Sequence, residues 1–171
     1  MSKASPSPPG SAKTRRTFHI VASRFNAQYV DGLVDHVTEE LHALAPHGTI
    51  LVHRVPGSFE IPVVAREVAI QNTADAIIAC GVILRGETNH AENLSRSVTD
   101  ALQRIAIEHG VPVINAVLSF ESETQAHARC LENKINRGTE AARTAVEIAN
   151  VLSEVRTNQG ATVSKPSRDN G

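Results

Sequence analysis

Four short apolar runs alternate with segments of helical periodicity, and this alternation constrains the fold more than any other feature. The runs span residues 18–22, 49–53, 76–82 and 111–118. Three of them carry β-branched residues throughout, and two are apolar nearly from end to end, as strands buried on both faces of a sheet are. We therefore predict four strands.

Apolar residues between and after these runs recur at the spacing of a helix. The pattern covers residues 30–44, 94–105 and 141–152, and shorter helices are predicted from about Pro62 and over 123–131. Proline is tolerated in a first helical turn. This order of elements predicts an α/β fold, a three-layer α/β/α sandwich around a four-stranded parallel sheet. Ligands of such sheets bind beyond the carboxyl ends of the strands, so the loops after each strand are where functional residues are expected.

Composition excludes several classes of partner. Lys and Arg number 17 against 18 Asp and Glu, and aromatic residues make up only 3%. We therefore expect no nucleic acid and no membrane as partner. No apolar run reaches the roughly 18 residues of a membrane-spanning helix, and residues 1–16 lack the apolar centre of a secretory signal. The two cysteines, Cys80 and Cys130, have no metal-binding spacing, and buried thiols in a reducing cytosol are their default interpretation, which predicts a cytoplasmic protein.

The chain is predicted to hold one catalytic domain between two polar ends. Residues 1–16 form a Pro- and Ser-rich arm, residues 17–155 the domain, and residues 156–171 a polar tail. Neither end has apolar residues to bury, so both are expected to be unstructured.

The loops after the first two strands carry candidate binding residues. Phe25 could cover the flat face of a ring, although, taken alone, a core phenylalanine packed under the next helix is the favoured interpretation. Gly57 and Ser58 are small enough for the backbone to approach a ligand, and Glu60 could accept hydrogen bonds from hydroxyl groups. A turn followed by an acidic residue favoured by the helix dipole is the alternative.

The loop after the third strand is the most informative. Gly86 allows a sharp turn, and Thr88 or Asn89 can cap a helix that begins there. The unpaired amides of that helix start, with the Thr88 hydroxyl, make a site suited to phosphate. His90 would lie in the first helical turn, and histidine moves protons readily at neutral pH. A surface histidine in a first turn is the alternative interpretation.

The last candidate functional residues lie at and after the end of the fourth strand. Asn115 and Ser119 lie near its end, and Arg129 could complete a phosphate site with charge-assisted hydrogen bonds, or simply be a solvated helix arginine. The chain contains no nucleotide P-loop, no Gly-x-Ser-x-Gly, no His-Glu-x-x-His and no Gly-x-Gly-x-x-Gly. We predict no metal site.

Taken together and in order, these loops resemble the lumazine synthase family of riboflavin biosynthesis. The matching pieces are Arg24-Phe25-Asn26, Val55-Pro56-Gly57-Ser58-Phe59-Glu60-Ile61-Pro62, Arg85-Gly86-Glu87-Thr88-x-His90, Val111-Pro112-Val113-Ile114, Gln125-Ala126 with Arg129, and Asn136-Arg137-Gly138-Thr139-Glu140-Ala141-Ala142. The resemblance runs from about Thr17 to Leu152. It implies a flavodoxin-like fold.

The resemblance also implies a reaction. Members condense 5-amino-6-(D-ribitylamino)uracil with 3,4-dihydroxy-2-butanone 4-phosphate to give 6,7-dimethyl-8-ribityllumazine, phosphate and water. The route passes through a Schiff base, loss of phosphate, ring closure and dehydration. It uses no metal and no organic cofactor.

The family's functional residues map onto this chain by position. His90 matches the proton-transfer residue. Those matching the pyrimidine and ribityl site are Phe25, Ser58, Phe59, Glu60, Val82, Ile83, Leu84 and Asn115. Those matching the phosphate site are Glu87, Thr88 and Arg129.

The chain departs from the family pattern at three places. Ala91 and Glu92 follow His90 where an aromatic residue and then an acid are usual, and Glu92 could still orient His90. Asn115 stands where many members place an aromatic residue against the pyrimidine. Ser119-Phe120-Glu121 replaces Thr-Thr-Glu, so Phe120 could substitute for that missing aromatic.

The resemblance implies a homopentamer whose sites lie between subunits, with Phe25 and Asn115 from different chains. Pairing of two pentamers into a decamer, closure of twelve into an icosahedral shell of 60 subunits, and association with riboflavin synthase are left open. Two other functions are also left open. One is an archaeal-type riboflavin synthase, which the phosphate-type loop at His90 disfavours. The other is a non-catalytic flavin-binding or shell-forming homologue.

Overall fold

The computed structural model describes residues 7–10, 15–86 and 89–157. Every predicted strand and helix is present. The elements are β1 (Thr17–Ser23), α1 (Ala27–Leu44), β2 (Thr49–Val55), a 3-10 turn η1 (Ser58–Glu60), α2 (Ile61–Gln71), β3 (Ala76–Leu84), α3 (His90–His109), β4 (Val113–Phe120), α4 (Glu123–Cys130) and α5 (Arg137–Arg156).

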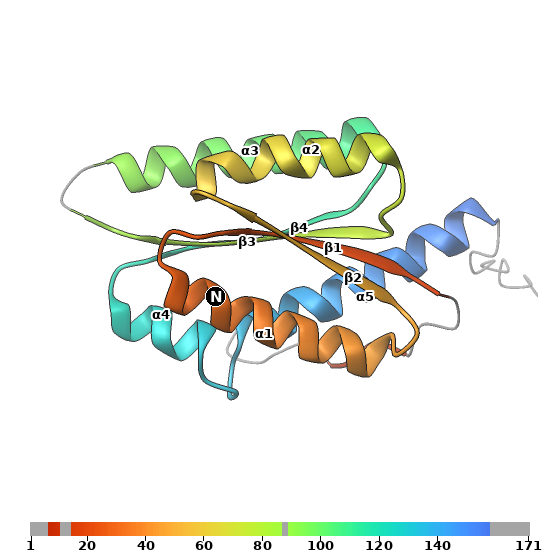
Figure 1. Cartoon of the computed structure of the whole chain (residues 1–171), viewed down its shortest axis with the longest axis horizontal. Helices are drawn as coiled ribbons and strands as arrows, with labels where there is room; N and C mark the ends of the chain where they lie inside the picture. Colours follow the sequence, from red (N-terminus) through yellow and green to blue (C-terminus); the bar gives the residue numbers. More distant parts are fainter. Residues whose placement is uncertain (1–6, 11–14, 87–88, 158–171) are drawn as a thin grey trace, which may run out of the picture.

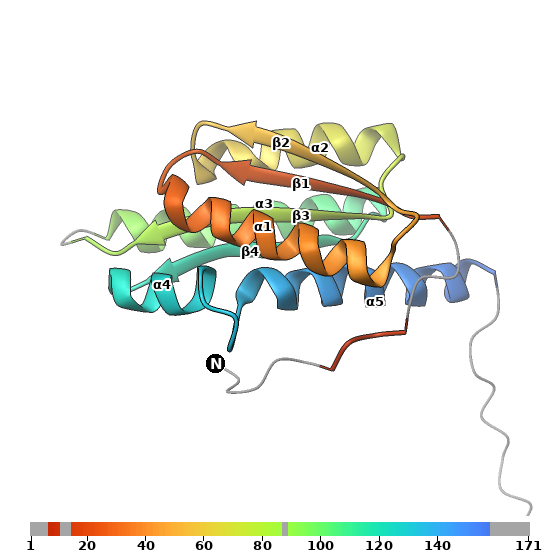
Figure 2. The ribbon, with the colours of Figure 1, turned by 60° about the horizontal axis from the view of Figure 1, so that its bottom comes forward.

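The four strands form one parallel sheet in the order β2-β1-β3-β4. Helices α2 and α3 cover one face, and α1, α4 and α5 cover the other (Figure 1). All four carboxyl ends lie at the same side of the molecule, at the left in Figure 2. The predicted three-layer α/β/α sandwich is therefore confirmed. This strand order is that of flavodoxin-like sheets, in which the chain reverses its direction of winding between β1 and β3.

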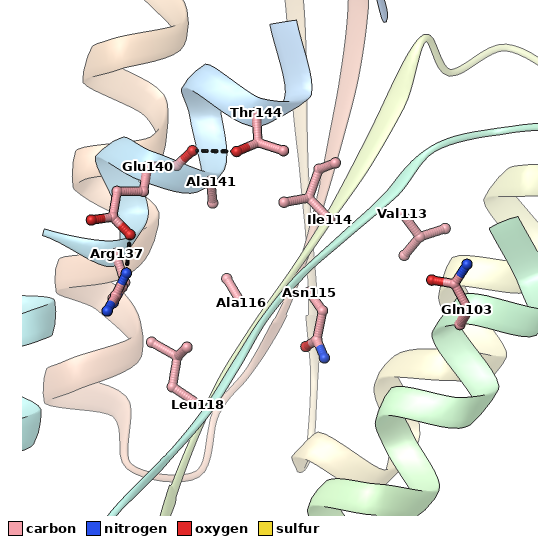
Figure 3. A pocket seen from close by; sticks show the side chains of 10 residues that line it. All are labelled: Gln103, Val113, Ile114, Asn115, Ala116, Leu118, Arg137, Glu140, Ala141 and Thr144. Atoms are coloured by element: carbon pink, nitrogen blue, oxygen red, sulfur yellow. Dashed lines mark hydrogen bonds and ion pairs between the residues drawn. The ribbon is translucent and has the colours of Figure 1, made fainter. Parts of the chain in front are cut away.

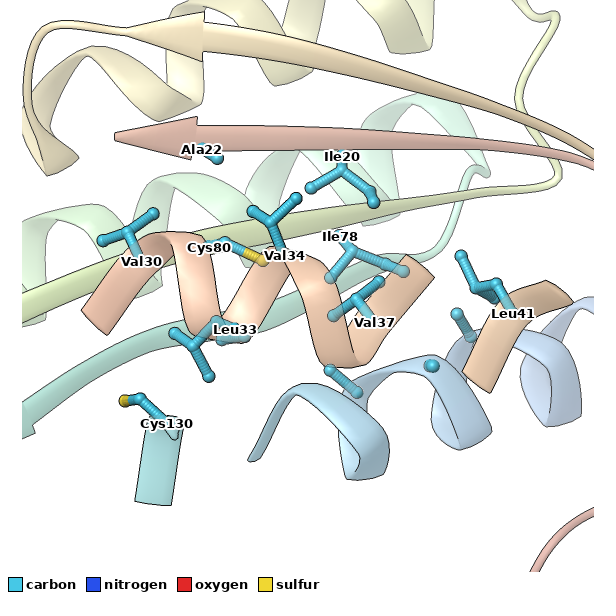
Figure 4. Close-up of a cluster of buried hydrophobic side chains, with 14 of the residues drawn as sticks. Ile20, Ala22, Val30, Leu33, Val34, Val37, Leu41, Ile78, Cys80 and Cys130 are labelled. Carbon is cyan, nitrogen blue, oxygen red and sulfur yellow. The ribbon is translucent and has the colours of Figure 1, made fainter. Parts of the chain in front are cut away.

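Successive residues of the strands point to opposite faces of the sheet and belong to two separate hydrophobic cores. Ile20 and Ile78 point to the side of α1 and α5, where they belong to the same core as Leu33 and Leu41 of α1 (Figure 4). Ile77, one position before Ile78, faces α2 and α3 instead, as the two-residue period of a strand requires. Both faces of β3 are therefore buried, which accounts for its unbroken apolar sequence.

Both cysteines are buried and unpaired. Burial raises the pKa of the Cys80 and Cys130 thiols to about 12, so both remain protonated at neutral pH. Within the described ranges, no helix has the length and apolar character needed to cross a membrane.

Candidate functional site

The candidate site is created where β1 and β3 separate. The paired register of these strands ends at Ala22 and Cys80. Beyond it the chain stays with β2, because the backbone N–H of Arg24 donates to the Val55 carbonyl at 2.8 Å and that of Phe25 to the Pro56 carbonyl at 3.2 Å. The end of β3 is thus left without a strand on its β1 side. A separation of this kind is where open α/β sheets bind ligands.

A cavity of about 610 Å³ lies at this separation. Most of the predicted site residues line it, although they come from three separate segments, which follow β1, follow β2, and join the end of β3 to the start of α3. The lining residues are Phe25, Asn26, Gly57, Ser58, Phe59, Glu60, Val82, Ile83, Leu84, Gly86, His90, Ala91 and Leu94. The structure therefore brings together eight of the predicted residues, namely Phe25, Ser58, Phe59, Glu60, Val82, Ile83, Leu84 and His90.

Two phenylalanines stand open to solvent in the single chain. Phe25 is 71% exposed and Phe59 is 65% exposed. The interpretation of Phe25 as a core residue under the next helix is therefore wrong. Large exposed aromatic side chains beside a cavity are available to contact a ring or a second protein chain.

The loop after β2 is held tightly by its own residues. Glu60 accepts a hydrogen bond from the Gly57 backbone N–H at 2.9 Å through Oε2, which closes the turn before α2. Ser58 is buried, and its hydroxyl lies against β3 at Gly81, where an added Cβ would come within 2.6 Å of Ser58 Oγ. Gly81 is therefore needed for this close approach. The second Glu60 oxygen, Oε1, makes no hydrogen bond among the described residues.

His90 is the first residue of α3, and Asn89 occupies the cap position before it. The N–H groups of a first helical turn have no carbonyl partner inside the helix, and His90 lines the cavity at this helix start. Glu87 and Thr88 lie outside the described residues. Glu92 pairs with Arg96 at 3.6 Å and faces a different hollow, beside Ser119, rather than His90. The hypothesis that Glu92 orients His90 receives no support from this arrangement.

Asn115 lies apart from this cavity. It lines a second cavity, of about 600 Å³, at the free edge of β4 between α3 and α5 (Figure 3). Its amide already serves the chain itself: Nδ2 donates to Thr99 Oγ1 at 3.0 Å, and Oδ1 accepts from the Val117 backbone N–H at 2.9 Å. The second of these bonds satisfies a backbone donor at the open edge of the sheet.

Arg129 and Phe120 also lie away from the cavity at His90. Arg129 is half-buried on α4 and lines another, separate hollow with Gln125 and Lys134. Phe120 is 4% exposed and belongs to the core on the side of α1 and α5, so it does not substitute for an aromatic residue near Asn115.

The sequence prediction missed three lining residues, Asn26, Ala91 and Leu94. Asn26 directly precedes α1, a position that commonly favours asparagine as a helix cap, and that signal could have drawn attention to it. Leu94 was interpreted only as part of the apolar helix face. Among the described residues, no group of three or more His, Cys, Asp or Glu is placed to hold a metal ion.

Comparison with known proteins identifies the family. A family model described as 6,7-dimethyl-8-ribityllumazine synthase matches residues 15–153. The chain belongs to this family. The lumazine synthase of Paraburkholderia phymatum is 45% identical over 133 residues, which cover 77% of this chain and 75% of that protein. Those of Burkholderia mallei and Burkholderia pseudomallei are 44% identical over the same shares of the two chains.

Among solved structures, a chain from Bacteroides fragilis covers 88% of this chain at 12% identity, and 68% of its own length is matched. Its TM-score of 0.38 is too low to support any inference.

Proposed function

We propose that this chain condenses 5-amino-6-(D-ribitylamino)uracil with 3,4-dihydroxy-2-butanone 4-phosphate to form 6,7-dimethyl-8-ribityllumazine, phosphate and water. Membership of the family supports the reaction. The assignment to this site rests on one observation, the lining of the cavity between β1 and β3. It combines an exposed aromatic ring, a fixed hydroxyl and carboxylate, and a histidine at a helix start.

The pyrimidine end of the site lies over the carboxyl end of β3. The Phe25 ring would stack on the flat heterocycle, while backbone groups of Ile83 and Leu84 would bond its polar edge. Ser58, Phe59 and Glu60 would hold the ribityl chain, whose hydroxyls suit the remaining lone pairs of Glu60. Val82 lines the same cavity.

The phosphate end lies at the start of α3. Its partial positive charge and unpaired N–H groups favour a dianion, and Glu87 and Thr88 belong to the loop that leads into it. Among the described residues that line this cavity, none is a lysine or an arginine. We assign the role of a cation to Arg129, whose guanidinium suits phosphate.

His90 would transfer protons between the reacting groups. Formation of the Schiff base and the final dehydration each remove a hydroxyl group as water, and each needs a proton delivered to oxygen. Such general acid–base catalysis contributes roughly 10²- to 10⁴-fold. Holding the two substrates side by side offsets the entropy of bringing them together and would supply much of the remaining acceleration.

The proposal requires more than one chain. Asn115 and Arg129 lie in cavities other than that of His90, so a neighbouring subunit would have to supply them. We propose a homopentamer with five sites between adjacent chains, whether or not pentamers then pair or close into a shell. The two buried, unpaired thiols suit a reducing compartment, which supports a cytoplasmic location as part of the proposal.

The two-substrate assay tests the reaction. Purified protein is mixed with both substrates, and the lumazine is followed by its fluorescence against a sample without protein. Product that appears faster with protein supports the proposal. A rate equal to the uncatalysed one would support a flavin-binding or shell-forming role instead. Riboflavin formed from lumazine alone would indicate a riboflavin synthase.

A further inference from the structure

The carbonyl of Val82 lies at the point where β3 loses its neighbour. The Ile77 backbone N–H donates to the Pro112 carbonyl, and the Arg85 N–H to the Phe120 carbonyl, so odd-numbered residues of β3 turn their peptide groups toward β4. Val82 therefore faces the β1 side. The registered pairs of β1 and β3 end two residues earlier, at Ala22 and Cys80, so no strand of the sheet pairs with this carbonyl.

A side chain takes the place of the missing strand. Asn26 Nδ2 donates a hydrogen bond to the Val82 carbonyl at 2.8 Å, across the separation between β1 and β3. The Asn26 backbone is left-handed, with φ 55° and ψ 42°, and its carbonyl accepts from the Tyr29 and Val30 N–H groups that begin α1. Asn26 thus joins the Phe25 loop, the start of α1 and the end of β3.

Few residue types meet both demands at this position. Asparagine tolerates left-handed backbone better than most residues, and its amide can donate to a carbonyl. Glycine would satisfy the backbone and lose the donor. Aspartate would also tolerate the backbone, but its ionised carboxylate is only an acceptor and would face the Val82 carbonyl.

We infer that Asn26 is a positioning residue for the pyrimidine substrate. Through its bond to Val82 it fixes the separation between the Phe25 ring and the backbone of Ile83 and Leu84, the two surfaces between which the heterocycle is held. Asn26 acts by setting this gap and not by contact with the phosphate end at His90. The inference rests on the proposed function of the cavity.

The test compares Asn26→Gly and Asn26→Asp with the wild type. Binding of 5-amino-6-(D-ribitylamino)uracil alone is measured by calorimetry near pH 8 and near pH 5, and KM for each substrate is measured by turnover. We expect Asn26→Gly to bind the pyrimidine about tenfold more weakly at both pH values, the usual effect of losing one hydrogen bond. KM for the butanone phosphate should change less than about twofold.

Asn26→Asp separates the hydrogen bond from the backbone requirement. Near pH 8 its carboxylate cannot donate, so binding should weaken at least as much as in Asn26→Gly. A carboxyl facing a carbonyl is favoured in its protonated form, which does donate. Relative to wild type at the same pH, Asn26→Asp should therefore recover affinity near pH 5, whereas Asn26→Gly should not.

Asn72 provides a matched control. It is the other described non-glycine residue with left-handed backbone, at φ 52°, and it ends α2 outside the cavity. Asn72→Gly and Asn72→Asp should bind the pyrimidine like the wild type at both pH values. Circular dichroism would verify that each variant is folded.

Two results overturn the inference while leaving the proposed function intact: wild-type binding in both Asn26 variants, or an Asn26→Asp defect that is the same at both pH values. A wild-type protein that neither binds the pyrimidine nor forms lumazine would instead overturn the proposed function, and this inference with it.

Discussion

His90 and Arg129 occupy different cavities of the chain, and their proposed roles differ in kind. Substitution of His90 by Ala should lower kcat by roughly 10²- to 10⁴-fold with pyrimidine binding largely kept, because a proton carrier is lost and no stacking surface is. Arg129→Ala should instead raise KM for the butanone phosphate by roughly tenfold or more, since a charge-assisted hydrogen bond is removed. Steady-state kinetics with each substrate varied in turn measures both. An equal loss of pyrimidine binding in the two variants would contradict these separate roles.

Another residue-scale prediction concerns a histidine pair outside the cavity. The Nδ1 of buried His19 lies 2.9 Å from Nε2 of His53, and the two rings are stacked with centroids 5.2 Å apart. Burial, and the charge that His53 acquires when protonated, lower the pKa of His19 below its ordinary value of 6.5. The unfolded chain therefore binds a proton more readily than the folded chain does. Stability should be complete above about pH 6.5 and should fall as the pH drops below it.

Urea unfolding of wild type and His19→Gln between about pH 7.5 and pH 5 measures this effect. When the unfolded chain binds one proton more than the folded chain, the free energy of unfolding changes by up to about 1.4 kcal/mol per pH unit. His19→Gln should lack this contribution. The exposed His47→Gln serves as the matched control. Slopes that are identical in wild type and His19→Gln would exclude the His19 origin.

Some site residues could be placed from the sequence because the sheet topology positions them, whereas others are positioned by contacts that no local pattern shows. Phe25, Ser58 and His90 follow three strands of a parallel sheet, whose carboxyl ends share one edge, so their convergence followed from the topology. Asn115 and Arg129 were grouped with them because they lie at and after the fourth strand and because the resemblance maps them to the same site. The Asn26 side chain bonds to the Val82 carbonyl of β3, and that partner lies 56 positions away, beyond any local pattern.

The elements themselves were predictable, and their ends were less so. The apolar period marks only the buried face of a helix, so it indicated α5 only from Ala141, whereas the helix begins at Arg137. The start of α3 at His90 was predicted from its capping residues and not from its apolar period, which begins at Leu94. Helix starts are decided by capping groups and not by burial. The strand order β2-β1-β3-β4 also required tertiary information, since alternation alone allows several orders.

The start of α5 gives the prediction at the scale of elements. Asn136 is 1% exposed, and its Oδ1 accepts from the N–H groups of Gly138 at 2.8 Å and Thr139 at 3.4 Å. Its Nδ2 donates to the Glu132 carbonyl at 3.0 Å, which joins the start of the preceding loop to the helix. Asn136→Ala should therefore lower the free energy of unfolding by about 2 kcal/mol or more, because it leaves buried backbone groups without partners.

Ser122 supplies the comparison for that measurement. It caps α4 through a single exposed hydrogen bond, from the Gln125 N–H at 3.3 Å. Ser122→Ala should cost only about 0.5 to 1 kcal/mol in the same urea titration. Equal losses at the two caps would mean that the buried position of Asn136 adds nothing.

At the scale of the whole molecule, the proposed site is divided between chains, and mixing two impaired variants tests this division. In a ring where each site takes His90 from one subunit and Arg129 from its neighbour, a random equal mixture of His90→Ala and Arg129→Ala chains regains both native residues at about a quarter of the sites. At a butanone phosphate concentration well below the KM of Arg129→Ala, refolding the two variants together should therefore give roughly a quarter of the wild-type rate, more than either variant gives when it is refolded alone. If both residues acted within one chain, no mixed assembly could contain an intact site, and activity would stay at the level of the separate variants. Native mass measurement of the refolded sample distinguishes a failure to mix from a site that lies within a single subunit, since only mixed rings show masses between those of the two pure assemblies.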